Sequence, residues 1–227
     1  MRAVCALALA LLIAVPCNSD DAIDTFDVGR PFLSGRIGGF ASPDGKEKMQ
    51  CPLPGSQHQQ NTGGIDGAGL CVYASERHSG RWQNDPLFDA LFDYMKTQEG
   101  GSYPAKFAAT VKSCAKLRGY PVPNYVQIQD NDIEVLKLAC KNGYMPGVTY
   151  GYSPTGRYGG RRISHMVSIT HATDNWFAVL DNNYIGDKQF EWLKPTEFAR
   201  SHTTGGTGWK IILLTVPPPP KPYMRAK

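Results

Sequence analysis

Helical patterns fill the first half of this chain, and strand patterns fill the second half. Helix-type apolar spacing, bounded by glycine or proline, covers residues 71–79, 86–99, 104–117 and 132–140. Apolar runs typical of strands cover 145–152, 163–171, 176–180, 189–192 and 209–216, with a short helix at 195–200. This segregation predicts an α+β fold in which a helical N-terminal part packs on an antiparallel β-sheet.

The pattern along the chain predicts one domain with an extension at each end. The 227 residues are enough for one sizeable core and too few for two. Residues 20–56 are rich in Gly, Pro, Asp and Ser, and predict an extended lead-in that wraps the domain. The domain itself is expected over 57–216. Residues 217–227 begin with consecutive prolines and predict a polyproline-like tail outside the core.

Residues 1–19 have the pattern of an export signal peptide. A positive start at Arg2 precedes an apolar run over 4–15, which Pro16 ends. Such a run suits a signal peptide and is short for a membrane span, although a buried N-terminal helix is the alternative. We therefore expect an extracytoplasmic protein, secreted or periplasmic. Cys17 makes lipid anchoring a second option, which the preceding proline disfavours.

The composition restricts the class of partner. Hydrophobic residues make up 41% and charged residues 19%, which suits a soluble domain without a membrane span. The net charge of +4 permits an anionic partner without requiring one, so no nucleic acid is expected. The chain has no CxxC pair and its histidines lack zinc-ligand spacing, so neither a metal nor another cofactor is expected.

Four of the cysteines lie beyond the signal region: Cys51, Cys71, Cys114 and Cys140. Four cysteines allow three pairings, and the sequence does not choose among them. If Cys71 is a free nucleophile, the other three cannot all pair with one another. Cys114 and Cys140 each lie near the end of an expected helix, so they are the candidate bridge of an exported protein.

Cys71 begins an expected helix directly after the glycine-dense loop 61–69. The N-terminus of a helix favours the thiolate, which is the nucleophilic form of cysteine. Packing or a disulfide is the alternative role. His165 lies near the start of the expected strand 163–171 and Asp181 follows the next strand, so an antiparallel hairpin brings them together. A carboxylate beside a histidine fixes its tautomer and leaves the other ring nitrogen to face a thiol.

This ordered set resembles the papain-like cysteine peptidases. The matching segments are Gly69-Leu70-Cys71-Val72-Tyr73-Ala74-Ser75, His165-Met166-Val167 and Asp181, which lies 16 residues after the histidine. The run Asp181-Asn182-Asn183 ahead of Gly186 is most similar to the bacteriocin-processing-peptidase-like bacterial branch, where Asp commonly holds the third position. The resemblance covers roughly residues 57–200 in order and spacing, and it implies a papain-like fold.

The resemblance implies a role for each residue of the set. Cys71 corresponds to the nucleophile, His165 to the general base and acid, and Asp181 to the residue that orients the histidine. Asn182 is the alternative third member, because a one-residue register slip would turn it inward instead.

The family also uses a glutamine shortly before the cysteine to bind the oxyanion together with the cysteine N–H. This chain departs from that pattern, since Ile65 stands six residues before Cys71. Gln60 is the candidate oxyanion donor, which requires the glycine loop to bulge.

The implied activity is that of an exported thiol hydrolase. It would cleave an amide bond of a protein, a peptide or peptidoglycan through an acyl-enzyme on Cys71. A transglutaminase-like acyl transferase would use the same three roles. Two non-enzymatic alternatives remain: a catalytically inactive papain-like binding module, which the departure at Ile65 supports, and a disulfide-stabilised binder in which Cys71 is bridged.

Several other polar residues have expected surface positions. Arg157, Arg161 and Arg162 are expected at the rim of the site, with binding of an anionic substrate as the alternative. His78 is expected on an exposed helix face, and His171 at the surface near the hairpin turn.

Overall fold

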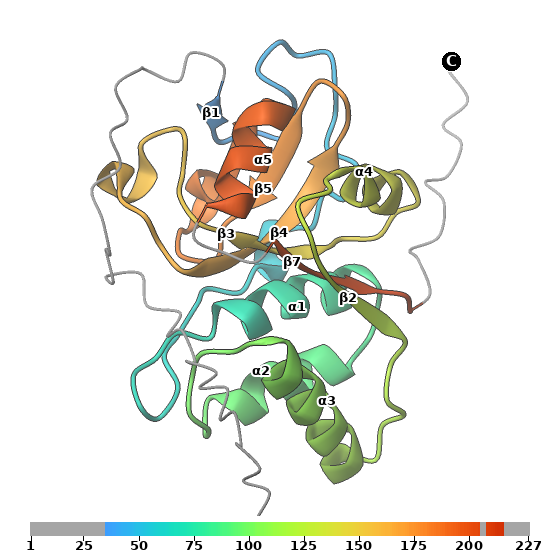
Figure 1. Cartoon of the computed structure of the whole chain (residues 1–227). Coiled ribbons are helices and arrows are strands. Elements are labelled where there is room, and N and C mark those ends of the chain that lie inside the picture. Colours follow the sequence, from blue (N-terminus) through green and yellow to red (C-terminus); the bar gives the residue numbers. More distant parts are fainter. Residues whose placement is uncertain (1–34, 205–207, 216–227) are drawn as a thin grey trace, which may run out of the picture.

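The computed structural model describes residues 35–204 and 208–215, which form one sheet with helices on both faces (Figure 1). The helices are α1 (Cys71–Trp82), α2 (Leu87–Met95), α3 (Pro104–Arg118), α4 (Glu134–Lys141) and α5 (Pro195–Thr203). The strands are β1 (Arg36–Ile37), β2 (Tyr125–Gln129), β3 (Gly147–Tyr150), β4 (His165–Ala172), β5 (Phe177–Leu180), β6 (Phe190–Leu193) and β7 (Trp209–Leu213). Three short 3-10 helices are η1 (Gly55–Gln57), η2 (Arg157–Gly160) and η3 (Gly186–Gln189).

The described strands form a single seven-stranded sheet in the order β1-β6-β5-β4-β3-β7-β2. Every neighbouring pair is antiparallel. Strand β4 lies at the centre, and all eight of its residues are buried. The expected α+β class with an antiparallel sheet is therefore confirmed.

Helices α1, α2 and α3 cover one face of the sheet (Figure 1). Their apolar side chains pack on Met166 of β4 and on Trp209 and Ile211 of β7. Helix α1 lies between the sheet and α2, since it contacts both α2 and β4. This layer places the start of α1 against the central strand.

Helices α4 and α5 cover the opposite face, where Leu136 of α4 and Phe198 of α5 pack on Val167 and Val179. Residues 35–53 cover the rest of the first face. Apolar residues of this segment pack on β5 and β6; the cluster includes Met49, Cys51, Leu53, Ala178, Leu180 and Trp192. The part of the expected lead-in that the structure describes thus contributes Met49, Cys51 and Leu53 to the core.

The β4–β5 hairpin contains a β-bulge at Thr170, which adds one residue to β4 and none to β5. The pairs around it are Ser168 with Leu180, Ile169 with Val179, His171 with Ala178, and Ala172 with Phe177. The carbonyl oxygen of Thr170 accepts the N–H of Cys51 at 2.8 Å. A bulge reverses which residues beyond it share a face, so it matters for the residues at the open end of the hairpin.

Strand β2 is not predicted by the sequence pattern. It follows a proline-containing segment, carries two glutamines and is only partly buried. Its five residues pair along their whole length with β7 at the edge of the sheet. The strand state here comes from the partner strand rather than from a local pattern.

The expected export signal (1–19) and tail (217–227) lie outside the described residues. Across residues 35–204 and 208–215, no helix is long and apolar enough to cross a membrane.

Candidate active site

His165 and Asp181 meet at the open end of the β4–β5 hairpin. His165 is the first residue of β4, and Asp181 directly follows β5. The Nε2 atom of His165 lies 2.9 Å from Oδ1 of Asp181, and both side chains are buried. The expected pairing is therefore present. Because the carboxylate occupies Nε2, Nδ1 is the ring nitrogen that remains for a reacting thiol.

The bulge at Thr170 explains why the acid rather than the neighbouring amide reaches the histidine. Ser168 pairs with Leu180, so the next pair toward the open end of the hairpin is Val167 with Asp181. Val167 and His165 point to the same face of β4, and Asp181 therefore shares that face. Without the extra residue, Asn182 would take that place. The choice between the two candidate third members thus depends on one inserted residue near the turn.

Asn182 lies on the other face and holds the start of α1. Its Nδ2 lies 3.1 Å from the carbonyl oxygen of Cys71, 2.9 Å from Ser75 Oγ and 3.0 Å from the carbonyl oxygen of Met166. One carboxamide therefore joins the first turn of α1 to the residue that follows His165. This contact brings Cys71 and His165 to the same end of the sheet.

Asp181 is fully buried, yet it is held as an anion. Tyr158 donates its hydroxyl to Oδ2 at 2.7 Å, and the N–H of Asn183 donates to Oδ1 at 3.0 Å. Burial alone would raise the pKa of Asp181. The charge and hydrogen bond of His165, the charge of Arg157 and the Tyr158 hydroxyl hold that pKa below its ordinary 3.8.

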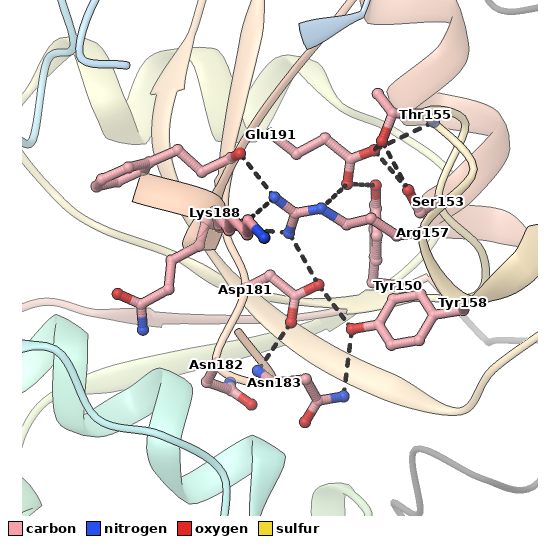
Figure 2. A network of polar contacts seen from close by, with 12 residues as sticks. Tyr150, Ser153, Thr155, Arg157, Tyr158, Asp181, Asn182, Asn183, Lys188 and Glu191 are labelled. Atoms are coloured by element: carbon pink, nitrogen blue, oxygen red, sulfur yellow. Dashed lines mark hydrogen bonds and ion pairs between the residues drawn. The ribbon is translucent and has the colours of Figure 1, made fainter. Parts of the chain in front are cut away.

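Arg157 is buried behind this pair, so its expected position at the rim is wrong. Figure 2 shows its guanidinium between two carboxylates: Nη1 lies 3.3 Å from Asp181 Oδ2 and Nε 3.9 Å from Glu191 Oε2. Its Nη2 donates to the carbonyls of Lys188 and Phe190. With both terminal nitrogens engaged inside the protein, this arginine supports Asp181 rather than a substrate anion.

Glu191 of β6 balances the charge of Arg157 from the other side (Figure 2). Its carboxylate accepts the hydroxyls of Tyr150 at 2.7 Å and Ser153 at 2.6 Å, and the N–H of Thr155 at 3.3 Å. The loop between β3 and β4 is thereby attached to the sheet. The sequence offers no signal for this role, since Glu191 stands in an ordinary apolar strand pattern.

Cys71 is buried at the first position of α1 and is disulfide-bonded in this structure. The other cysteines of the described residues, Cys51, Cys114 and Cys140, are free thiols. The expected bridge between Cys114 and Cys140 is therefore wrong. Cys114 packs among helices α1–α3, whereas Cys140 packs in the cluster on the opposite face.

Gln60 is exposed, and within the described ranges its side chain makes no hydrogen bond to the candidate site. The side-chain amide of the next residue, Asn61, contacts the residue that precedes α1. Its Oδ1 accepts the N–H of Leu70 at 2.6 Å, and its Nδ2 donates to Asn183 Oδ1 at 3.0 Å. The sequence pattern did not single out Asn61. Its position next to Gln60 is the one sequence feature that could have indicated it.

The expected surface positions of two histidines are also wrong, because both are buried. His78 accepts the N–H of Gln59 at Nε2 (2.7 Å), and its Nδ1 lies 3.0 Å from Ser168 Oγ. Burial lowers the pKa of His78 to about 3, so it is neutral at physiological pH. His171 contacts Glu47 at 2.7 Å. Both are structural members of the core, away from the His165–Asp181 pair.

No protein-family model matches this chain, and a search of the curated proteins finds no match.

Proposed function

We propose that this chain is an extracytoplasmic thiol hydrolase of papain-like fold that cleaves an amide bond of a protein, a peptide or peptidoglycan. Cys71 is the nucleophile, His165 the general base and acid, and Asp181 the residue that orients the imidazole. The observation that carries the proposal is the buried hydrogen bond of 2.9 Å between His165 Nε2 and Asp181 Oδ1. It directs the other ring nitrogen away from the carboxylate, as nucleophile activation requires.

The catalytic cycle starts from the reduced protein, because Cys71 is disulfide-bonded here. A thiol reductant attacks the sulfur that is bonded to Cys71. The Cys71 thiol is released, and the attacked sulfur forms a mixed disulfide with the reductant. The location of the sulfur at the N-terminus of the 12-residue helix α1 then favours the thiolate.

The thiolate attacks the substrate carbonyl carbon after Nδ1 of His165 accepts the thiol proton. The C–N bond breaks as the imidazolium returns that proton to the departing amine, which leaves a thioester on Cys71. Water, deprotonated by His165, attacks the thioester and releases the acid, and the sulfur regains its proton from the imidazolium. Asp181 stays ionised throughout and stabilises the imidazolium.

The oxyanion of the tetrahedral intermediate needs donors near the sulfur. The N–H of Cys71 is one, at a helix start where backbone donors are free of helical partners. Asn61 replaces Gln60 in this proposal: its Oδ1 accepts the N–H of Leu70, the residue before the nucleophile, and its Nδ2, which donates one N–H to Asn183, has a second N–H for the oxyanion.

The test compares the wild type, Cys71→Ser and His165→Gln after mild reduction. Iodoacetamide should label Cys71 in the wild type, and His165→Gln should lower kcat/KM on a peptide or peptidoglycan substrate by roughly 10²–10⁴-fold. Asp174→Asn is the matched control, since this exposed acid lies at the turn end of the same hairpin. Full activity in His165→Gln would refute the assignment.

Two other functions are distinguished by the same experiment. An acyl transferase would release the amine product but pass the acyl group to an added amine. An inactive binding module would turn over neither substrate even with a labelled Cys71; the exposed Gln60 and the Cys71 disulfide favour this second candidate.

A further inference from the structure

Two free thiols, Cys51 and Cys140, approach the bulge in β4 from different parts of the chain. Cys51 belongs to the segment 35–53, and Cys140 lies in the last turn of α4. Both side chains are buried. Their neighbours in sequence give no indication of this proximity, since 88 residues separate them.

Backbone contacts bring both residues to adjacent peptide groups of β4. The N–H of Cys51 donates to the carbonyl of Thr170 at 2.8 Å, and Sγ of Cys140 lies 3.8 Å from the carbonyl oxygen of Ile169. The sulfur of Cys51 in turn lies 3.5 Å from the carbonyl oxygen of Tyr144, just beyond the end of α4. Cys51 thus lies beside the end of α4, and both cysteines contact neighbouring peptide groups of β4.

The two side chains also contact each other. The pKa of the Cys140 thiol is raised well above 9.0, first by burial and then by a hydrogen bond and charge interaction with Cys51. A buried thiol of this kind is a poor nucleophile in the folded protein. A bond between the two sulfurs would therefore form during folding, before α4 and the segment 35–53 close over them.

We propose that Cys51 and Cys140 are a disulfide site that ties the segment 35–53 to helix α4. The bond forms by two exchanges with an exposed disulfide, such as that of an oxidoreductase or oxidised glutathione. One cysteine sulfur first displaces a thiolate from the donor, and the other then displaces the second. Each cysteine loses one proton, the S–S bond forms, and the donor leaves as two thiols.

This bond would protect the bulge that selects Asp181. The N–H of Cys51 donates to the carbonyl oxygen of the bulged residue Thr170, and a covalent bond to α4 would keep that donor in place. The proposal is independent of any catalytic role of Cys71.

The first experiment maps disulfides in the full chain after folding in a mixture of reduced and oxidised glutathione. The protein is denatured, free thiols are alkylated, and the digest is analysed by mass spectrometry without reduction. We expect a linked pair of peptides that contain Cys51 and Cys140, lighter than their sum by two hydrogen atoms. Alkylation of both cysteines, or linkage of either one to Cys71 or Cys114, would overturn the proposal.

The second experiment measures thermal unfolding of Cys51→Ser, Cys140→Ser and the double variant against the unsubstituted parent, in which the Cys71 disulfide is kept. In oxidising buffer each should melt roughly 10 °C below the parent, with no additivity, because one bond is lost in every case. In a thiol reductant, the difference in melting temperature between the parent and the variants should become smaller. Cys114→Ser is the control, since this buried free thiol packs among helices α1–α3 and not beside the bulge. Equal melting of parent and double variant in both buffers would contradict the proposal.

Discussion

Two fully buried carboxylates of this protein have opposite properties. Asp181 contacts His165, Tyr158 and Arg157, and its pKa is held below the ordinary value. Glu76 lies in α1 against β3, and neither of its carboxylate oxygens has a hydrogen-bond partner among the described residues. Burial raises the pKa of Glu76 well above 4.5. Equal burial thus accompanies a lowered pKa at one acid and a raised pKa at the other.

The difference shows that partners, and not depth, set the charge of a buried acid. The Asp181 region contains a buried cation, a second acid that balances it, and a loop that brings Tyr158 in at a φ of 60°. The Glu76 carboxyl instead fills the room that Gly147 leaves, since a Cβ there would meet Oε1 at 2.0 Å. The lowered pKa of Asp181 depends on several polar and charged partners, whereas the raised pKa of Glu76 needs burial alone.

The largest test of this comparison removes the cation. Arg157→Met leaves Asp181 and Glu191 buried without their shared positive charge, which should lower the free energy of unfolding by about 3–5 kcal/mol. Thermal unfolding should shift down by roughly 10 °C. Arg162→Met, a half-buried arginine a few residues further along, is the control and should melt with the wild type. An unchanged melting temperature of Arg157→Met would mean that the charge pairing contributes nothing.

The second test removes the unpartnered acid. Glu76→Met replaces a buried carboxyl with an unbranched apolar chain and should raise the free energy of unfolding by about 2 kcal/mol near neutral pH. The pKa of Glu76 is raised on folding, so its contribution is fully present below 4.5 and is lost as the pH rises towards the raised value.

The gain from Glu76→Met should therefore grow with pH, as denaturant unfolding at several pH values would measure. Glu134→Met, an exposed glutamate in α4, is the control and should show no such trend. A gain that shrinks with rising pH would contradict the raised pKa of Glu76.

The smallest test removes one hydrogen bond to the anion. Tyr158→Phe deletes the donor that lies 2.7 Å from Asp181 Oδ2 and should cost about 1.5 kcal/mol of stability. The acid limb of the stability profile should move to higher pH, since one cause of the lowered Asp181 pKa is gone. Tyr94→Phe on α2 is the matched control and should leave both quantities unchanged.

The elements that were predicted from sequence are those with strong local signals. Helix α3 starts at Pro104 and ends before Gly119, which has a φ of 70° as a helix C-cap requires. Strand β2 was missed because its pairing with β7, and no alternation of its own, makes it a strand. Local periodicity is thus informative where an element buries one face, and weak at the edge of a sheet.

The candidate site was predicted in part for a similar reason. A hairpin with a tight turn brings its open ends together, so the proximity of His165 and Asp181 follows from chain order. The buried arginine that supports this pair could not be predicted from chain order. Arg157 reads like Arg161 and Arg162 in a polar loop, yet it alone of the three is buried beside two carboxylates.

By itself the sequence determined the order of helices and strands, the start of α1 at Cys71 and the hairpin that joins His165 to its partner. These depend on residues close together in the chain. The tertiary structure decided that Asp181 rather than Asn182 faces the histidine, through the bulge at Thr170. It also decided which acid is charged and which thiols meet. Those outcomes depend on contacts between distant segments, because the energy of a buried polar group is set by the atoms packed around it.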